Sequence, residues 1–138
     1  MASGSLVYLD TSAALKRIKL ETESQALEGY VTRQAAFGCV LVSSELIRTE
    51  LSRAMWRGGR EAAEQVTRLL AALAQIPVTR AILDHAGALL PGRRLRSLDA
   101  IHLASALGLG DQLSALVTYD ALMLELAGEL GVATASPT

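Results

Sequence analysis

The chain is poor in cysteine, aromatic residues and long apolar runs. It has one Cys, one Trp, three Tyr and one Phe among 138 residues. Cys39 therefore cannot form an internal disulfide, and in the apolar stretch 39–42 a buried thiol acts as a small hydrophobe, which suits a reducing, cytoplasmic compartment. No apolar run approaches the roughly 20 residues that span a bilayer, and no charged segment followed by an apolar one opens the sequence. These absences predict neither membrane insertion nor secretion.

The chain also lacks an excess of charge of either sign. Thirteen Lys and Arg stand against fourteen Asp and Glu, which gives a formal net charge of −1. The whole molecule therefore has no general attraction for polyanions, and any binding of nucleic acid must be local. Two basic groups can either hold phosphates or form solvated surfaces. They are Arg48, Arg53, Arg57 and Arg60, and Arg93, Arg94 and Arg96.

The length and composition predict one compact domain. With 51% hydrophobic and 20% charged residues, the chain can bury a sizeable core without staples. We expect a single domain over residues 1–138, in which 1–5 and 136–138 are flexible tails.

Short apolar runs alternate with helical patterns along the sequence. The predicted strands are 6–9, 39–42, 76–78, 115–118 and 132–134, the third at a sheet edge because Pro77 cannot donate to a ladder. Helices are expected after Asp10, over 22–36, after a Ser43-Ser44 cap, over 61–74 and 79–89, from Ser97, and up to Gly131. This alternation predicts an α/β fold with a central parallel sheet of about five strands between helical layers.

Four acids far apart in sequence fall where a strand ends or on an adjoining helix: Asp10, Glu50, Asp99 and Asp120. The carboxyl ends of parallel strands meet at one edge of a sheet, so these side chains can converge there. Several carboxylates share a cleft only if a cation neutralises them or some are protonated. Carboxylate oxygens suit Mg²⁺ or Mn²⁺, and such ions support phosphodiester hydrolysis.

Simpler readings compete for several of these residues. The helix dipole favours acids at helix starts whatever their function, which applies to Asp99 and to Glu45, the rival of Glu50. His102 can pair with Asp99 on a metal, but imidazole suits softer ions, so a partly buried, hydrogen-bonded histidine is favoured. His85 is expected at the surface. Met55 and Trp56 are expected in the core or at a partner contact rather than as a base-stacking platform.

Four segments together resemble the PIN-domain ribonucleases, especially VapC-like toxins of toxin–antitoxin pairs. They are Asp10-Thr11-Ser12-Ala13, Glu50-Leu51-Ser52-Arg53-Ala54, Leu98-Asp99-Ala100-Ile101-His102-Leu103-Ala104 and Thr118-Tyr119-Asp120. The resemblance runs from about Leu6 to Val132. It implies a three-layer α/β/α PIN-like fold, a Mg²⁺ or Mn²⁺ site and metal-dependent cleavage of RNA.

The resemblance also implies roles for single residues. Asp10 and Asp99 would be direct ligands, while Glu50 and Asp120 would complete the cluster or hold a water on the ion. The hydroxyls of Ser12 and Thr118 match supporting positions. Arg94 and Arg96, just before the Asp99 helix, are expected to meet RNA phosphates.

The partners implied by the resemblance are an RNA substrate, a second copy of the chain and an antitoxin whose peptide blocks the cleft. Leu46, Met55, Trp56 and Val66 are candidates for apolar contact surface, with core burial favoured for most of them.

Other classes fit less well. A dehalogenase-like phosphatase needs an acid where Ser12 stands, and a receiver domain needs an acidic pair near its first strand. A non-catalytic binding module on the same fold stays open.

Overall fold

A computed structural model describes residues 4–138, so the part of the expected tail at 1–3 lies outside the described residues. The strands are β1 (Leu6–Leu9), β2 (Val40–Ser44), β3 (Ala74–Ile76), β4 (Leu113–Val117) and β5 (Thr134–Ala135). The helices are α1 (Thr11–Leu15), α2 (Ser24–Ala36), α3 (Ile47–Met55), α4 (Gly59–Ala71), α5 (Arg80–Ala88), α6 (Ser97–Leu107) and α7 (Ala121–Glu129). Short 3₁₀ turns lie at Trp56–Gly58 and Gly110–Gln112.

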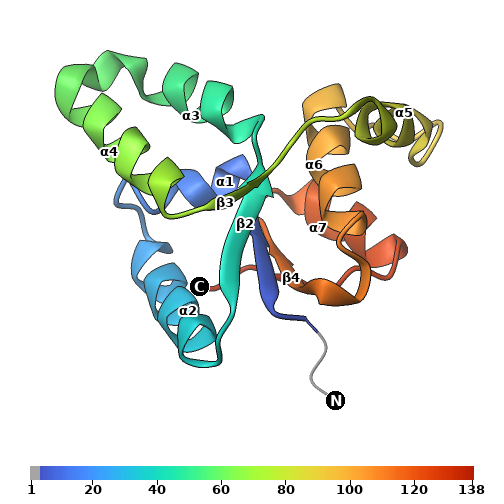
Figure 1. Ribbon diagram of the computed structural model, residues 1–138, viewed down its shortest axis with the longest axis horizontal. Helices are drawn as coiled ribbons and strands as arrows, with labels where there is room; N and C mark the ends of the chain where they lie inside the picture. Colours follow the sequence, from blue (N-terminus) through green and yellow to red (C-terminus); the bar gives the residue numbers. More distant parts are fainter. Residues whose placement is uncertain (1–3) are drawn as a thin grey trace.

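The five strands form one parallel sheet in the order β3-β2-β1-β4-β5. Figure 1 looks along the sheet from the β3 side, with α1 to α4 on one face and α5 to α7 on the other. The predicted three-layer α/β/α fold with a parallel five-stranded sheet is therefore confirmed. None of the helices in residues 4–138 is long and apolar enough to cross a membrane.

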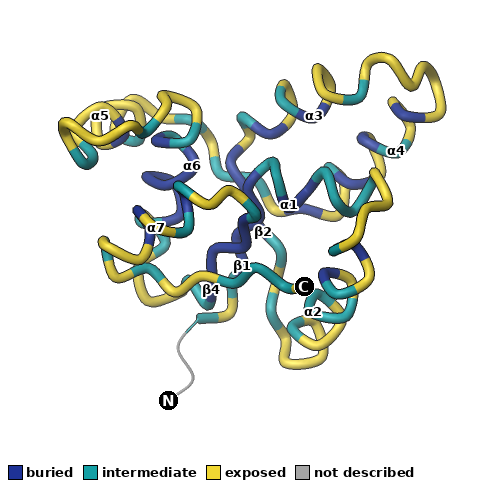
Figure 2. The backbone as a smooth tube through the Cα atoms, turned by 180° about the vertical axis from the view of Figure 1, so that it is seen from behind, coloured by how far each residue is buried: buried dark blue, intermediate teal, exposed yellow. Residues whose placement is uncertain are grey.

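The alternation of side chains along β1 explains the two cores. Val7 and Leu9 pack on one face with helices α1 to α4, while Tyr8 packs on the other with α6 and α7. Figure 2 shows buried residues concentrated in the strands and on the inner sides of the helices. Because β1 is covered on both faces, its sequence is a continuous apolar run.

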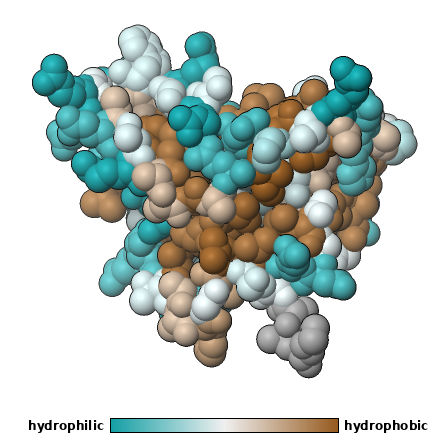
Figure 3. All heavy atoms as spheres, in the orientation of Figure 1, coloured by the Kyte–Doolittle hydropathy of each residue, from teal (hydrophilic) through white to brown (hydrophobic). Residues whose placement is uncertain are grey.

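The β3 side of the sheet is only partly covered. β3 pairs with Val42–Ser44 alone, so the first half of β2 has no strand partner on that side, and Val40 is half exposed. In Figure 3 hydrophobic residues gather in the middle of this face, and hydrophilic residues cover much of the outer ends of the helices. β3 itself is an edge strand, as Pro77 predicted, but it lies at Ala74–Ile76 because the missing N–H of proline ends the ladder before residue 77.

The other element boundaries shift by a few residues. The last strand is Thr134–Ala135 rather than 132–134, and α4 spans Gly59–Ala71 rather than 61–74 because β3 starts at residue 74. The predicted helix over 22–36 begins two residues later, at Ser24, and ends at Ala36 as expected, with Gly38 following at a φ of 83°, a conformation that favours glycine.

The expected hydroxyl cap at Ser43-Ser44 is right only for Ser44, whose Oγ accepts from Leu46 N–H at 3.1 Å before α3, and the first-turn position of Glu45 is wrong. Both serines belong to β2, since the Ser43 hydroxyl donates to the Leu9 carbonyl and Glu45 N–H extends the ladder to Ile76. Helix α3 starts only at Ile47, and Glu45 Oε1 accepts a hydrogen bond from Val78 N at 2.9 Å. The acid in the first turn of α3 is Glu50.

The expected apolar contact residues have different environments. Val66 is buried in the core, and Met55 and Leu46 are half-buried. Trp56 is 70% exposed in the 3₁₀ turn between α3 and α4, which rules out the core for it and leaves the partner contact as its expected role. His85 is exposed, as predicted.

The described parts of both chain ends make backbone contacts. The Ser5 carbonyl accepts from Val40 N–H, and the Pro137 carbonyl accepts from the Tyr119 hydroxyl.

Candidate active site

Asp10 lies at the junction of β1 and α1 and is 4% exposed. Its Oδ1 caps the helix by accepting from Ala13 N–H at 3.0 Å and also accepts from the Ser12 hydroxyl at 2.6 Å. The Thr118 hydroxyl, from the residue that follows β4, donates to Oδ2. Burial raises the pKa of Asp10, and these hydrogen bonds only partly offset that rise. The structure thus places Ser12 and Thr118, the two predicted supporting residues, directly against the Asp10 carboxylate.

Glu50 connects three helices at the same edge of the sheet. From the first turn of α3, its Oε1 accepts from the Thr11 hydroxyl at 2.6 Å and lies 2.6 Å from Nε2 of His102. Burial would raise the pKa of Glu50, but the hydrogen bonds to His102 and Thr11 outweigh it and lower the pKa. The carboxylate is therefore held in its charged form, whereas Glu45 is bonded elsewhere.

His102 is a hydrogen-bonded histidine, as predicted, but it is fully buried rather than partly buried. Its Nδ1 lies 2.7 Å from the Tyr8 hydroxyl, and its Nε2 contacts Glu50. The sequence reasoning missed the partners Tyr8 and Thr11. A tyrosine inside an apolar strand is a usable signal, since its hydroxyl needs a buried partner, and so is a threonine directly after the acid that caps a helix.

Asp99 and Asp120 start the helices on the other side of the sheet. Asp99 is half-buried in the first turn of α6, and Asp120 is an exposed N-cap whose Oδ1 accepts from Met123 N–H at 2.9 Å. Burial, followed by the charges of Asp120, Asp10 and Glu50, raises the pKa of Asp99, while His102 acts in the opposite direction. The charges of the other three acids therefore all act on Asp99 at this edge of the sheet.

The donor chemistry of these acids fits a hard divalent cation. Among residues 4–138, no protein hydrogen bond reaches Glu50 Oε2, Asp120 Oδ2 or either oxygen of Asp99. Carboxylate oxygens of this kind are what Mg²⁺ and Mn²⁺ prefer. However, no three His, Cys, Asp or Glu side chains of the described residues converge as a ready ligand set. A cation bound by three of the acids would therefore require side-chain rotation.

The basic loop before α6 divides into two parts. Arg93 is bound to α7 through Glu125 at 2.9 Å and Glu129 at 2.6 Å. Arg94 and Arg96 are exposed, and neither forms an ion pair within the part of the chain that the structure describes. Arg96 is the N-cap residue of α6, three positions before Asp99. Its place on the chain keeps it close to the acidic edge.

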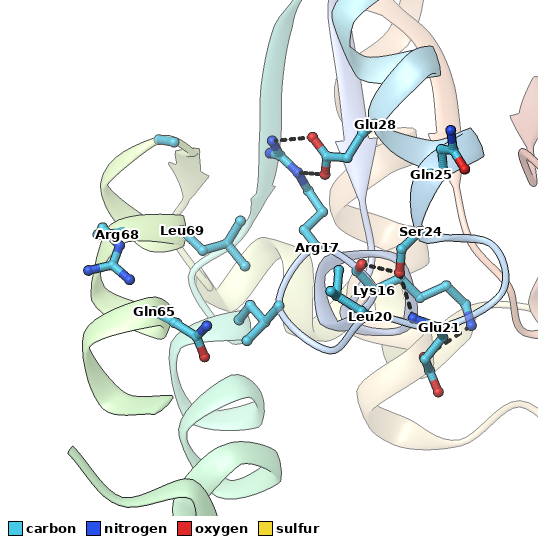
Figure 4. Close-up of a pocket in the computed structure, with 12 residues that line it drawn as sticks. Lys16, Arg17, Leu20, Glu21, Ser24, Gln25, Glu28, Gln65, Arg68 and Leu69 are labelled. Carbon is cyan, nitrogen blue, oxygen red and sulfur yellow. Dashed lines mark hydrogen bonds and ion pairs between the residues drawn. The ribbon is translucent and has the colours of Figure 1, made fainter. Parts of the chain in front are cut away.

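A separate cavity of about 730 Å³ lies between the segment after α1, helix α2 and helix α4 (Figure 4). None of the four acids lines it. At its rim Arg17 pairs with Glu28, and Lys16 lies 3.2 Å from Glu21. The cavity is therefore distinct from the acidic edge.

The comparisons with known proteins agree on one family. A family model described as PIN domain matches residues 7–129. The protein named Ribonuclease VapC46 of Mycobacterium tuberculosis is 44% identical over 133 residues, 96% of this chain and 98% of that protein. Ribonuclease VapC47 of the same species is 39% identical over 133 residues, 96% of this chain and 97% of that protein.

Solved structures of similar shape carry related names. VapBC2 of Rickettsia felis, bound to a DNA fragment from its promoter, has a TM-score of 0.76 at 13% identity, covering 96% of this chain and 99% of that one. VapC20 of Mycobacterium tuberculosis, described as a Sarcin-Ricin loop cleaving toxin, has a TM-score of 0.63 at 21% identity, covering 95% and 99% of the two chains. These likenesses support the fold.

Proposed function

The chain belongs to the PIN-domain family and, within it, to the VapC ribonucleases, as the four motifs predicted, and we propose that it is a metal-dependent endoribonuclease acting as the toxin of a toxin–antitoxin pair. It hydrolyses phosphodiester bonds of RNA. The observation that carries this proposal is the sheet edge where Asp10 is buried and held by three donors, and where the charges of Asp10, Glu50 and Asp120 all act on Asp99.

The cofactor in this proposal is Mg²⁺ or Mn²⁺, held by Asp10 and Asp99 with Glu50 and Asp120 completing the cluster. A bound divalent cation supplies charge neutralisation and activation of a water for in-line attack on phosphorus. The burial that raises the pKa values of Asp10 and Asp99 supports it, because a positive charge at this edge stabilises both carboxylates.

The protein's own contribution is to hold these groups in position. Ser12 and Thr118 fix the orientation of Asp10, and Thr11 and His102 fix Glu50. Arg94 and Arg96 bind phosphates of the RNA, which is supported by their exposure and by the absence of ion pairs to them within residues 4–138. The acids themselves repel RNA, so binding depends on these local cations.

The partners in this proposal are an antitoxin protein and a second copy of the chain, and the site of action is the cytoplasm. The similarity to the VapC ribonucleases supports the antitoxin. Cys39, a free and half-buried thiol, is compatible with a reducing compartment.

An RNase assay on the purified protein tests the proposed function. RNA is incubated with protein in Mg²⁺, in Mn²⁺ and in EDTA, and the ends of the products are sequenced to identify the cleavage site. We expect cleavage only with a metal ion and a loss of roughly 100-fold or more in D10N and in D99N.

The variant D84N is the matched control, because Asp84 is an exposed aspartate on α5. Cleavage that survives in both D10N and D99N would defeat the metal mechanism. RNA that is bound by the wild-type protein and never cut would instead favour the non-catalytic binding module.

A further inference from the structure

A line of hydrogen bonds runs behind the acids from the sheet to Glu50. Ser44 N–H donates to the Tyr8 hydroxyl at 3.1 Å, which lies 2.7 Å from Nδ1 of His102. Nε2 of His102 lies 2.6 Å from Oε1 of Glu50. The line joins β2, β1, α6 and α3, and the side chains of Tyr8 and His102 are both buried. Elements from three distant parts of the sequence, with β2 and α3 consecutive, thus meet in one polar path.

The direction of each hydrogen bond follows from counting protons. A tyrosine hydroxyl has one proton to donate, and the Tyr8 oxygen already accepts from Ser44. Burial raises the pKa of Tyr8, so the hydroxyl keeps that proton. Among the hydrogen bonds of the described residues, the one with Nδ1 of His102 is the only one that can take this proton, because Ser44 N–H is itself a donor. The Tyr8 proton therefore goes to Nδ1 of His102, and the imidazole carries its own proton on Nε2.

Two donors then hold a single oxygen of Glu50. Oε1 accepts from His102 Nε2–H and from the Thr11 hydroxyl, which itself lies 3.2 Å from Nε2. No hydrogen bond from the described residues reaches Oε2. The carboxylate is therefore fixed through one oxygen while the other stays available to a ligand.

We propose that His102 is a positioning residue of the ribonuclease, which Tyr8 locks in the Nε2–H tautomer so that it presents Glu50 to the cation and the water. This inference rests on the proposed function. It assigns His102 no contact with the metal, since both ring nitrogens are already engaged. It also gives the proton of the Tyr8 hydroxyl a role, beside the oxygen's role as acceptor for Ser44 N–H.

The tautomer is tested directly by NMR on metal-free protein labelled with ¹⁵N-histidine. The chain has two histidines, and the exposed His85 serves as an internal reference, assigned with the H85Q variant. We expect His102 to show one protonated Nε2 and one unprotonated Nδ1, while His85 shows an averaged pattern. In Y8F the His102 signals should move toward the averaged pattern. A proton on Nδ1 in the wild type, or an averaged pattern there, would overturn the lock.

Activity and metal binding then separate positioning from simple packing. H102L removes the donor to Glu50, whereas H102Q keeps an amide N–H that can reach it. We expect H102L to lower kcat by roughly 10- to 100-fold and to weaken Mn²⁺ binding, with the KM for RNA unchanged. H102Q should recover a large part of both losses, and H85Q should match the wild type.

Each outcome of the kinetic comparison has a meaning. Equal losses in H102L and H102Q, or a wild-type kcat in H102L, contradict the positioning role. If H102L does not fold, the tautomer measurement on the wild type and on Y8F still decides the question. If the wild-type protein cuts no RNA, the proposed function fails, while the NMR result and Mn²⁺ binding still test how His102 holds Glu50.

Discussion

The two halves of the acidic edge are built differently. Asp10 and Glu50, on the α1 to α4 side, accept hydrogen bonds from Ser12, Ala13, Thr118, Thr11 and His102, and Asp10 is buried. Asp99 and Asp120 lie at the starts of α6 and α7, with a single protein donor between them, to Asp120. Within residues 4–138, only Glu50 Oε2 lacks a protein donor in the first half, which we call the held half, whereas three of the four carboxylate oxygens lack one in the second, the open half.

The difference shows where a cation has most to contribute. The first half keeps its geometry through protein donors alone, and the pKa of Glu50 is lowered there. In the second half the pKa of Asp99 is raised by burial and by the neighbouring carboxylates. Burial raises the pKa of Asp10 as well, but three protein donors partly offset that rise, whereas no donor from the described residues reaches Asp99. Under the proposed function, a cation would therefore stabilise Asp99 most. The first half would provide the fixed ligands, and the second would adjust to the ion.

The largest effect should come from removing charge in the held half. E50Q keeps the shape of the side chain but loses the anion, so we expect ribonuclease activity to fall by roughly 100-fold or more. E45Q is the matched control, because Glu45 bonds to Val78 through an oxygen that glutamine retains. Steady-state kinetics with Mg²⁺ check both variants. Equal losses would show that Glu50 has no special role.

A smaller effect is expected from the arginines beside the open half. The double charge reversal R94E/R96E should raise the KM for RNA by about 10-fold and reduce its salt dependence, because phosphate contacts are lost. Mn²⁺ affinity should stay near the wild-type value. R33E, on the exposed side of α2, is the control for a general charge effect. Unchanged cleavage in the double variant would remove these residues from the RNA site.

Removing one donor from Asp10 should be milder still. Ser12 donates to Asp10 and accepts from Tyr119 N–H at 2.9 Å. The S12A variant therefore loses the hydrogen bond to Asp10 and leaves the Tyr119 N–H without an acceptor. We expect the free energy of unfolding in EDTA to fall by about 1 kcal/mol. Urea denaturation measures it, with S114A as the matched serine control on β4. A loss no larger than that of S114A would mean that Ser12 does not secure Asp10.

The smallest effect is a stabilisation rather than a loss, and it concerns Asp99 in the open half of the acidic edge. Because burial and nearby acids raise the pKa of Asp99, its contribution to stability is present below the ordinary aspartate pKa of about 3.9 and is lost as the pH rises through the raised value. D99N carries no charge at any pH. In EDTA at pH 7 its Tm should therefore exceed that of the wild type by roughly 2 °C, and the two should converge near pH 3.5.

Thermal melts with and without Mg²⁺ complete this test. The cation should stabilise the wild type more than D99N, since it neutralises the acid that D99N lacks. A lower Tm for D99N than for the wild type at pH 7 in EDTA would mean that the charge of Asp99 does not destabilise the metal-free fold.

Much of the fold was predictable because it follows from local patterns. The apolar run at 6–9 is covered by helices on both faces. The alternation of short apolar runs with helical patterns along the chain correctly indicated a parallel sheet between two layers of helices. Boundaries were less predictable where tertiary hydrogen bonds compete with local preference. Ser43 and Ser44 have the chemistry of a helix cap, but the carbonyl of Leu9 and the ladder to β3 hold them in β2.

The sequence by itself determined the residue types and the family: four acids at strand ends and helix starts, and motifs typical of PIN-domain ribonucleases. Only the tertiary structure decided which groups hold those acids. The partners of Glu50 are Thr11, 39 positions away, and His102, 52 positions away, and Asp10 meets Thr118 across 108 positions. No local periodicity encodes such pairs, because they depend on which strands become neighbours and on the direction in which each buried polar group finds its donor.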